Sequence, residues 1–194
     1  MSTQKQSLRR RILRRLRCQS ERSRLLKSRR IQRRLCRLPI YRRARRVLCY
    51  VSFDGEVETG PLLKRMLAEG RRVAVPAALS GGRMAVVEIS DLKRDLRHTG
   101  LFGIPHPEPP WKRVPPAELD LVILPGIAFA PDGHRLGRGK GYFDRFLERV
   151  PKRVRRVGLG FDFQVTEKLP RLSHDQPVDR VITESAVYAN PARR

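Results

Sequence analysis

The stretch LDLVILPGIAFA, residues 119–130, is nearly all apolar. Such a run is typical of a strand whose two faces are both covered, as in a parallel sheet. It predicts the best-defined strand of this 194-residue chain. Shorter apolar runs predict further strands at 46–53, 71–79, 84–90, 155–163 and 179–189.

Helical patterns separate several of these strands. Residues 59–70 open with Thr59 as the predicted N-cap and end at Gly70. Residues 141–150 place aromatic and aliphatic side chains on one side. Strands that alternate with helices predict an α/β fold, with a three-layer, mainly parallel, Rossmann-like sheet covered by helices on both faces. We expect residues 1–194 to form this single domain.

The first 46 residues are intensely basic. They hold 19 of the 43 Lys and Arg residues and one acid, Glu21, which leaves 24 basic and 18 acidic residues for the rest of the chain. Apolar residues at helical spacing still predict two helices here, at 5–17 and 21–38. Because like charges crowd both helices, we expect them to be stabilised by packing against the rest of the domain.

Two interpretations of this charge are open. An Arg-rich region can bind the phosphates of a nucleic acid, or it can be a solvated helix face in an Arg-rich protein. Tyr41 is the only aromatic residue in the region, and base stacking favours more aromatic side chains. We therefore prefer the solvated face and keep a nucleic-acid-binding protein as the alternative function.

Composition also limits the compartment and the partners. Three cysteines without a paired spacing predict reduced thiols and a cytoplasmic protein. No apolar run approaches the ~18 residues of a membrane span, so we expect no membrane partner. We further expect a monomer.

The stretch RLGRGKGYFDRFL, residues 135–147, follows the best-defined strand and opens a helix. Alternate glycines let the backbone approach a ligand, and Arg138 and Lys140 add positive charge. Ligands of α/β sheets bind beyond the carboxyl ends of the strands. The spacing matches neither a Walker A loop nor the Rossmann fingerprint. By itself the stretch predicts an anion site, with a glycine-rich turn as the alternative.

A longer passage, LPGIAFAPDGHRLGRGKGYFDRFL (124–147), closely resembles the signature of the 5-formyltetrahydrofolate cyclo-ligases, also called methenyltetrahydrofolate synthetases. The resemblance extends along the chain to KQSLR (5–9), YVSFDGEVETGPLL (50–63), FGIPHPEP (102–109) and GFDFQVTEKLPRLSHDQPVDRVITES (160–185). Two positions depart from the family pattern. Ala130 stands where Asp is usual, and Phe143 replaces a second Tyr.

The resemblance implies an enzyme that joins ATP hydrolysis to a ring closure. ATP would phosphorylate the formyl oxygen of 5-formyltetrahydrofolate and leave as ADP. N10 of the folate would then attack the activated carbon, and phosphate would leave as 5,10-methenyltetrahydrofolate forms. Phosphoryl transfer needs positioning and charge neutralisation more than a protein nucleophile. The chain shows no convincing Ser-His-Asp or Cys-His arrangement, which agrees with this chemistry. ATP and Mg²⁺ are the implied cofactors.

The resemblance also assigns individual residues. Those implied for the nucleotide are Lys5, Arg9, Arg135, Leu136, Gly137, Arg138, Gly139, Lys140, Gly141, Tyr142 and Phe143. Those implied for the folate are Val51, Glu56, Phe102, Arg138 and Tyr142. Asp144 and Asp179 are implied for Mg²⁺. Because Lys5 and Arg9 belong to the nucleotide set, we interpret the basic N-terminus as mature protein rather than a transit peptide. Without the resemblance, most of these positions would be interpreted as solvated charges, turn residues or core.

Overall fold

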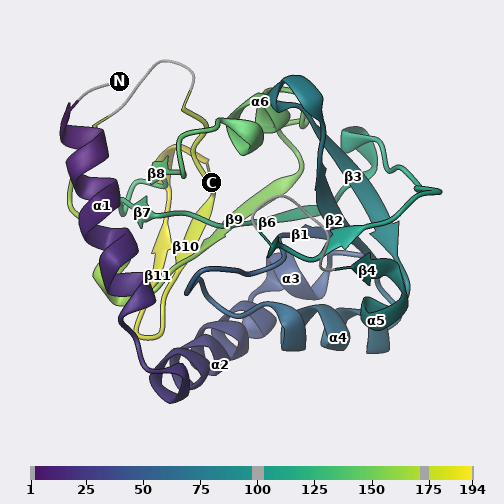
Figure 1. The fold of residues 1–194 in the computed structure, drawn as a ribbon, viewed down its shortest axis with the longest axis horizontal. Coiled ribbons are helices and arrows are strands. Elements are labelled where there is room, and N and C mark those ends of the chain that lie inside the picture. Colours follow the sequence, from purple (N-terminus) through teal and green to yellow (C-terminus); the bar gives the residue numbers. More distant parts are fainter. Residues whose placement is uncertain (1–2, 98–102, 171–174, 194) are drawn as a thin grey trace.

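A seven-stranded sheet forms the centre of the molecule, in the order β11-β10-β9-β6-β1-β2-β3 (Figure 1). The computed structural model describes residues 3–97, 103–170 and 175–193. The strands of the sheet are β1 (Arg46–Cys49), β2 (Arg72–Ala78), β3 (Met84–Ile89), β6 (Leu121–Leu124), β9 (Arg155–Leu159), β10 (Arg180–Ile182) and β11 (Val187–Ala189). The edge strands β3 and β11 pair antiparallel to their neighbours, and all other pairs are parallel. The predicted mainly parallel α/β fold is confirmed.

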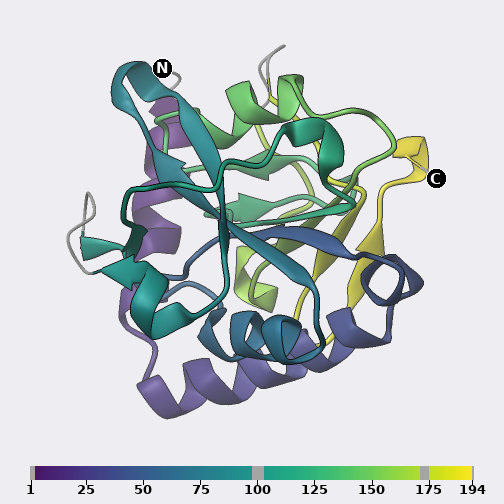
Figure 2. The ribbon, with the colours of Figure 1, turned by 90° about the vertical axis from the view of Figure 1, so that its right-hand side faces the viewer.

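Helices cover both faces of this sheet (Figures 1 and 2). The helices are α1 (Thr3–Arg17), α2 (Glu21–Arg37), α3 (Pro39–Arg42), α4 (Gly60–Ala68), α5 (Leu92–Asp95) and α6 (Tyr142–Glu148). In Figure 1, α2, α3 and α4 lie below the sheet and α6 lies above it, while α1 runs along one side. Two small hairpins complete the fold, β4 (Leu96–Arg97) with β5 (His106–Pro107) and β7 (Ala128–Phe129) with β8 (Arg135–Leu136).

Alternating side chains of the central strands divide the core into two layers. In β1, Val47 and Cys49 belong to the cluster that includes Leu62 of α4, whereas Leu48 belongs to the cluster that includes Leu147 of α6. Successive side chains of a strand point to opposite faces, and here both faces are buried. This explains why the strands are almost continuously apolar in sequence.

The two basic helices are part of this core, as expected. Ile12 and Leu16 of α1 and Ile31 and Leu35 of α2 are buried in the same cluster. Leu26 is 50% exposed and does not contribute to the packed side. None of the helices that the structure describes is long and apolar enough to cross a membrane.

The predicted strand 119–130 differs from the structure, because it is split into β6 and β7. The break falls at Pro125 and Gly126, between the two strands, and the Phe129 ring of β7 packs against three glycines. A Cβ would lie 2.5 Å from this ring at Gly126, 2.4 Å at Gly158 and 2.8 Å at Gly160. After the turn that follows β6, the ring of Phe129 in β7 packs against Gly158 and Gly160. The predicted strand 179–189 is likewise a hairpin, β10 and β11.

Candidate functional site

The candidate site lies where the order of the strands reverses. From β1 the chain continues to β2 and β3 on one side, and then returns to β6 on the other side before β9, β10 and β11. The segments after the carboxyl ends of β1 and β6 therefore leave in opposite directions. The crevice between two such segments is where α/β sheets bind ligands. Glu56 follows β1 and Arg138 follows β6 and the β7–β8 hairpin.

The structure brings Glu56 and Arg138 together. Nε and Nη2 of Arg138 donate to Oε1 of Glu56 at 3.2 and 3.1 Å. Oε2 of Glu56 accepts the backbone N–H of Phe53 at 3.3 Å. Only 5% of Glu56 is exposed. Burial raises the pKa of Glu56 to about 7, although Arg138 and the Phe53 N–H act in the opposite direction.

Two neighbours of Glu56 were not predicted from the sequence, and both contact Arg138. Oδ2 of Asp54 accepts from Nη1 of Arg138 at 2.9 Å. The ring of Phe53 lies under the guanidinium, with 3.9 Å from Cζ of Arg138 to the ring centroid. Asp54 also pairs with Arg17 of α1 at 2.8 Å. Hydrogen bonds from Arg17, followed by those from Arg138, lower the pKa of Asp54.

The turn that carries Asp54 is wedged against the end of α1. Asp54 has φ of 49° and Gly55 has φ of 80°. A Cβ on Gly55 would lie 2.4 Å from the carbonyl oxygen of Leu16, so this close approach requires glycine. Asp is one of the residues that tolerate the left-handed conformation. A loop with the letters DG signals a turn, but nothing in the sequence tells which arginine its aspartate meets.

The rest of the segment is held by internal hydrogen bonds. The predicted N-cap bond of Thr59 is absent from α4. Its hydroxyl instead donates to the carbonyl of Tyr50 at 2.8 Å and accepts the N–H of Ser52 at 3.0 Å. Glu58 accepts from Arg24 at 2.7 Å and from the Ser52 hydroxyl at 2.9 Å. These contacts fix the backbone on both sides of Glu56.

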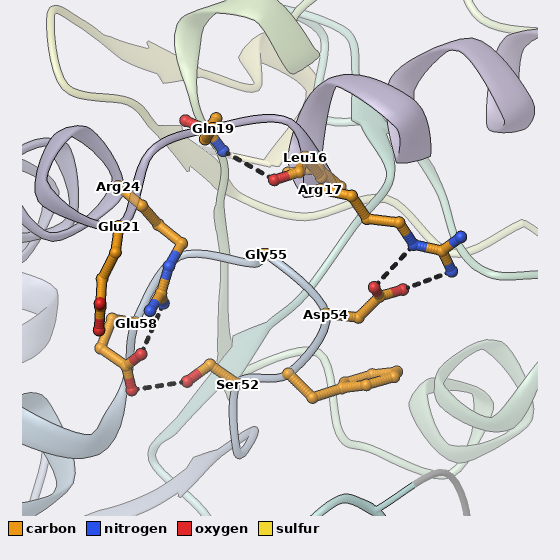
Figure 3. Close-up of a pocket in the computed structure, with 10 residues that line it drawn as sticks. Leu16, Arg17, Gln19, Glu21, Arg24, Ser52, Asp54, Gly55 and Glu58 are labelled. Carbon is orange, nitrogen blue, oxygen red and sulfur yellow. Dashed lines mark hydrogen bonds and ion pairs between the residues drawn. The ribbon is translucent and has the colours of Figure 1, made fainter.

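An open cavity of about 440 Å³ adjoins this segment (Figure 3). Its walls come from residues 52–58 and from the turn between α1 and α2; they include Leu16, Arg17, Gln19, Glu21, Arg24, Ser52, Phe53, Asp54, Gly55 and Glu58. In Figure 3 the pair Arg17–Asp54 closes one side and the pair Arg24–Glu58 the other. The walls of the cavity are therefore mainly polar, and they include Phe53 and Asp54, the two residues that contact Arg138.

The glycine-rich loop, residues 137–141, contains two glycines with positive φ. Gly139 and Gly141 have φ of 102° and 66°, a conformation that favours glycine. No backbone N–H of residues 137–141 donates to another group in the part of the chain that the structure describes. Lys140 is exposed at the tip. Consecutive free N–H groups beside a cation are typical of phosphate sites.

Helix α1 contacts this loop through Arg9. Nε of Arg9 donates to the carbonyl of Gly137 at 2.9 Å. Nζ of Lys5 pairs with Asp175 at 2.8 Å, and only 4% of Lys5 is exposed. Arg9 therefore contacts the backbone of the glycine-rich loop, whereas Lys5 pairs with Asp175.

Arg135 is a buried cation behind the loop. Its Nη2 donates to Oδ1 of Asp144 at 2.9 Å. Its Nε is buried and makes no hydrogen bond to any described residue. Burial lowers the pKa of Arg135, and the nearby Asp144 and Asp175 raise it. A Cβ at Gly137 would lie 3.3 Å from its Nη1. A buried guanidinium N–H that lacks an acceptor is costly, even where another nitrogen of the same group is paired.

The two predicted metal ligands have different surroundings. The side chain of Asp144 is 17% exposed, and its Oδ1 also accepts the Gln176 N–H at 3.4 Å. Asp179 is only 3% exposed, and its Oδ2 accepts the backbone N–H of Arg156 at 2.6 Å. Nη1 of Arg156 in turn donates to the Gln176 side chain at 3.3 Å. Among the described residues, no group of three or more His, Cys, Asp or Glu side chains could hold a metal ion.

The remaining residues predicted for the site have the following places in the fold. Leu136 is buried in β8, and Tyr142 and Phe143 begin α6. Val51 packs partly buried against the core beneath the β1 segment. Phe102 lies outside the described residues.

Comparison with known proteins relates the chain to one family. The sequence model of the 5-formyltetrahydrofolate cyclo-ligase family matches residues 1–184. The 5-formyltetrahydrofolate cyclo-ligase of Escherichia coli (strain K12) is 33% identical over 143 residues, which cover 72% of this chain and 78% of that protein. The NMR structure of Aquifex aeolicus 5,10-methenyltetrahydrofolate synthetase is 35% identical, with a TM-score of 0.85 over 96% of this chain and 93% of that one.

A structure of the synthetase from Mycoplasma pneumoniae is 20% identical and shares the fold, with a TM-score of 0.76 over 93% of this chain and 98% of that one. The Aquifex structure and the family match together cover both segments that meet at Glu56 and Arg138. The chain belongs to the 5-formyltetrahydrofolate cyclo-ligase family.

Proposed function

We propose that this protein catalyses the ATP-dependent cyclisation of 5-formyltetrahydrofolate to 5,10-methenyltetrahydrofolate, with release of ADP and phosphate. The observation that carries the proposal is the meeting of the Glu56 segment and the glycine-rich loop at the strand-order reversal, in a chain of this family. A buried carboxylate can accept hydrogen bonds from the N–H groups of a pterin. The N–H groups of residues 137–141, which have no acceptor among the described residues, can bind phosphates.

The charges of the loop fit a triphosphate. Arg135 has a buried Nε without a partner among the described residues, and Lys140 is exposed at the tip. Phosphate would supply the missing acceptor for Arg135 and neutralise Lys140. The exposed Lys140 is free to follow the transferred phosphoryl group, whereas Arg135 is fixed by Asp144. The formyl oxygen would receive the phosphoryl group and N10 would attack the activated carbon, so the chain's task is positioning and charge neutralisation.

Mg²⁺ is part of the proposal, and Asp144 fits it best. Mg²⁺ is usually held by one or two carboxylates together with substrate phosphates and water. Asp144 is partly exposed, lies next to Arg135, and offers oxygen ligands of the type that Mg²⁺ prefers. Asp179 is more deeply buried and already accepts an N–H, so its assignment as a second ligand stays a prediction. The ion would neutralise phosphate charge during transfer.

Turnover of the purified chain tests the function. Formation of the methenyl product is followed by absorbance, and ADP is quantified in the same reaction with 5-formyltetrahydrofolate, ATP and Mg²⁺. We expect one ADP for each methenyl product, and no product when ATP or Mg²⁺ is omitted. Product formation without ATP, or no turnover at all by a folded protein, would refute the proposal.

A further inference from the structure

Arg138 occupies the place that the substrate needs. If the proposed function holds, the pterin binds the carboxylate of Glu56. In the structure, Oε1 of Glu56 accepts from two donors of Arg138, and Oε2 accepts from the Phe53 N–H. Because Glu56 is only 5% exposed, the pterin cannot approach Oε1 until Arg138 moves. Arg138 therefore competes with the folate for the same acceptor.

Arg138 is also held by groups that do not belong to the folate contacts. Asp54 accepts from its Nη1 at 2.9 Å, and the Phe53 ring packs 3.9 Å beneath its guanidinium. We call Phe53, Asp54 and Glu56 the arginine seat. The three residues are nearly consecutive, so a single segment contacts Nε, Nη1 and Nη2 of Arg138 and one face of its guanidinium. Arg17 fixes Asp54 from the other side at 2.8 Å.

The loop that carries Arg138 allows it to leave this seat. Gly137 and Gly139 flank Arg138, and Gly139 has φ of 102°. Glycine on both sides lowers the cost of a change in backbone direction. The loop's N–H groups and Lys140 would bind the phosphates a few residues away. A phosphate accepts from a guanidinium through two parallel hydrogen bonds, so it is a strong competitor for a carboxylate.

We propose that the arginine seat couples the two substrates: Asp54 and Phe53 position Arg138 over Glu56 in the free chain, and nucleotide phosphates draw Arg138 away and expose Glu56 to the folate. Nucleotide binding then strengthens folate binding. By thermodynamic reciprocity, folate binding strengthens nucleotide binding by the same factor. Asp54 is a positioning residue, because it acts through Arg138 and not on the reacting atoms.

Calorimetric titration of 5-formyltetrahydrofolate tests this coupling, with and without a non-hydrolysable ATP analogue and Mg²⁺. In the wild type we expect the analogue to tighten folate binding about tenfold, within the usual range of such couplings. In Arg138→Gln this ratio should fall to about one. A matched control is Arg72→Gln, which breaks an exposed pair with Glu88 on β2 and β3 and should keep the wild-type ratio.

Asp54→Asn gives a result that simple structural damage would not give. The amide tolerates the left-handed backbone but holds Arg138 less tightly. Folate should therefore bind the nucleotide-free variant more tightly than the wild type, by about twofold to fivefold for a partly exposed pair. With the analogue present, the two affinities should be equal. Damage to the site would weaken folate binding instead, and that result would overturn the proposal.

Two further outcomes separate this proposal from the proposed function. A wild type that turns over normally but shows no change in folate affinity with the analogue would overturn the arginine seat alone. An unchanged ratio in Arg138→Gln, with a normal melting temperature, would do the same. Absence of folate turnover in the wild type would overturn the proposed function, and the seat with it.

Discussion

Glu56 is expected to lower the stability of the fold at neutral pH, and Glu56→Gln measures by how much. The carboxylate is buried beside Arg138 and Asp54, and the buried hydroxyl of Tyr50 is close enough to interact with it. Burial raises its pKa from 4.5 to about 7. Glutamine keeps the shape of the protonated acid and can still accept from Arg138, but it never ionises. The comparison therefore isolates the cost of the charge.

The sign and size follow from the two pKa values. Below pH 4.5 the acid is protonated in both states, and its contribution to stability is complete. Between pH 4.5 and 7 the unfolded chain loses its proton while the folded chain keeps it, so the free energy of unfolding falls as pH rises. At about 1.4 kcal/mol for each pH unit, the loss is about 3 kcal/mol. It is complete once the pH passes the folded-state value.

Chemical denaturation of wild type and Glu56→Gln at pH 5 and pH 8 tests this. The difference in unfolding free energy should shift by about 3 kcal/mol in favour of the variant at pH 8, or roughly 6–12 °C in melting temperature for a chain of this size. Glu58→Gln is the matched control. Burial raises the pKa of Glu58, but its pairing with Arg24 and Ser52 lowers it overall. The stability that Glu58 gives is therefore complete above pH 4.5, and the difference between Glu58→Gln and wild type should be the same at pH 5 and pH 8. A pH-independent difference for Glu56→Gln would refute the reasoning.

Four other changes extend these expectations. Lys140→Met should lower kcat/KM on the order of 10²-fold in steady-state kinetics, while folate binding without nucleotide is retained. Normal turnover of this variant would show that the glycine-rich loop is a structural turn and not a phosphate site. Gly55→Ala should lower stability by about 1–3 kcal/mol in thermal unfolding, because its Cβ would collide with Leu16. Asp144→Asn and Asp179→Asn should each raise the Mg²⁺ concentration needed for half-maximal rate; unchanged titrations would remove the metal assignment. Binding of a mixed-sequence RNA should fall about 10³-fold between low and physiological salt in a fluorescence titration, and tight, sequence-selective binding at physiological salt would favour the nucleic-acid alternative.

The strands and helices that are marked by a clear pattern of apolar residues could be predicted from the sequence. Continuous apolar runs identified the central strands because both faces of the sheet are buried. Helices α1 and α2 followed from apolar spacing despite their charge, because Ile12, Leu16, Ile31 and Leu35 pack on the sheet. The exception, Leu26, shows that spacing alone does not tell which of several apolar residues faces the core.

Features that depend on distant segments could not be predicted in this way. The packing of Phe129 depends on Gly158 of β9 and on Gly160, which directly follows that strand. Thr59 follows a capping pattern, yet its hydroxyl bonds to Tyr50, because the loop folds back on β1. Family resemblance indicated Arg138 and Glu56 as site residues. Their direct contact, and the parts played by Phe53 and Asp54, required the three-dimensional arrangement.

The ion pair between Lys5 and Asp175 joins residues 170 positions apart, and this has a consequence for the chain during its synthesis. At about 5–20 residues per second, roughly 10–30 s pass on the ribosome between these two residues. Throughout that interval α1 has neither its partner aspartate nor the late strands against which α1 and α2 lie. Helix α1 is thus among the last of these elements to reach its final position, because Lys5 lacks its partner until the segment around Asp175 has been made.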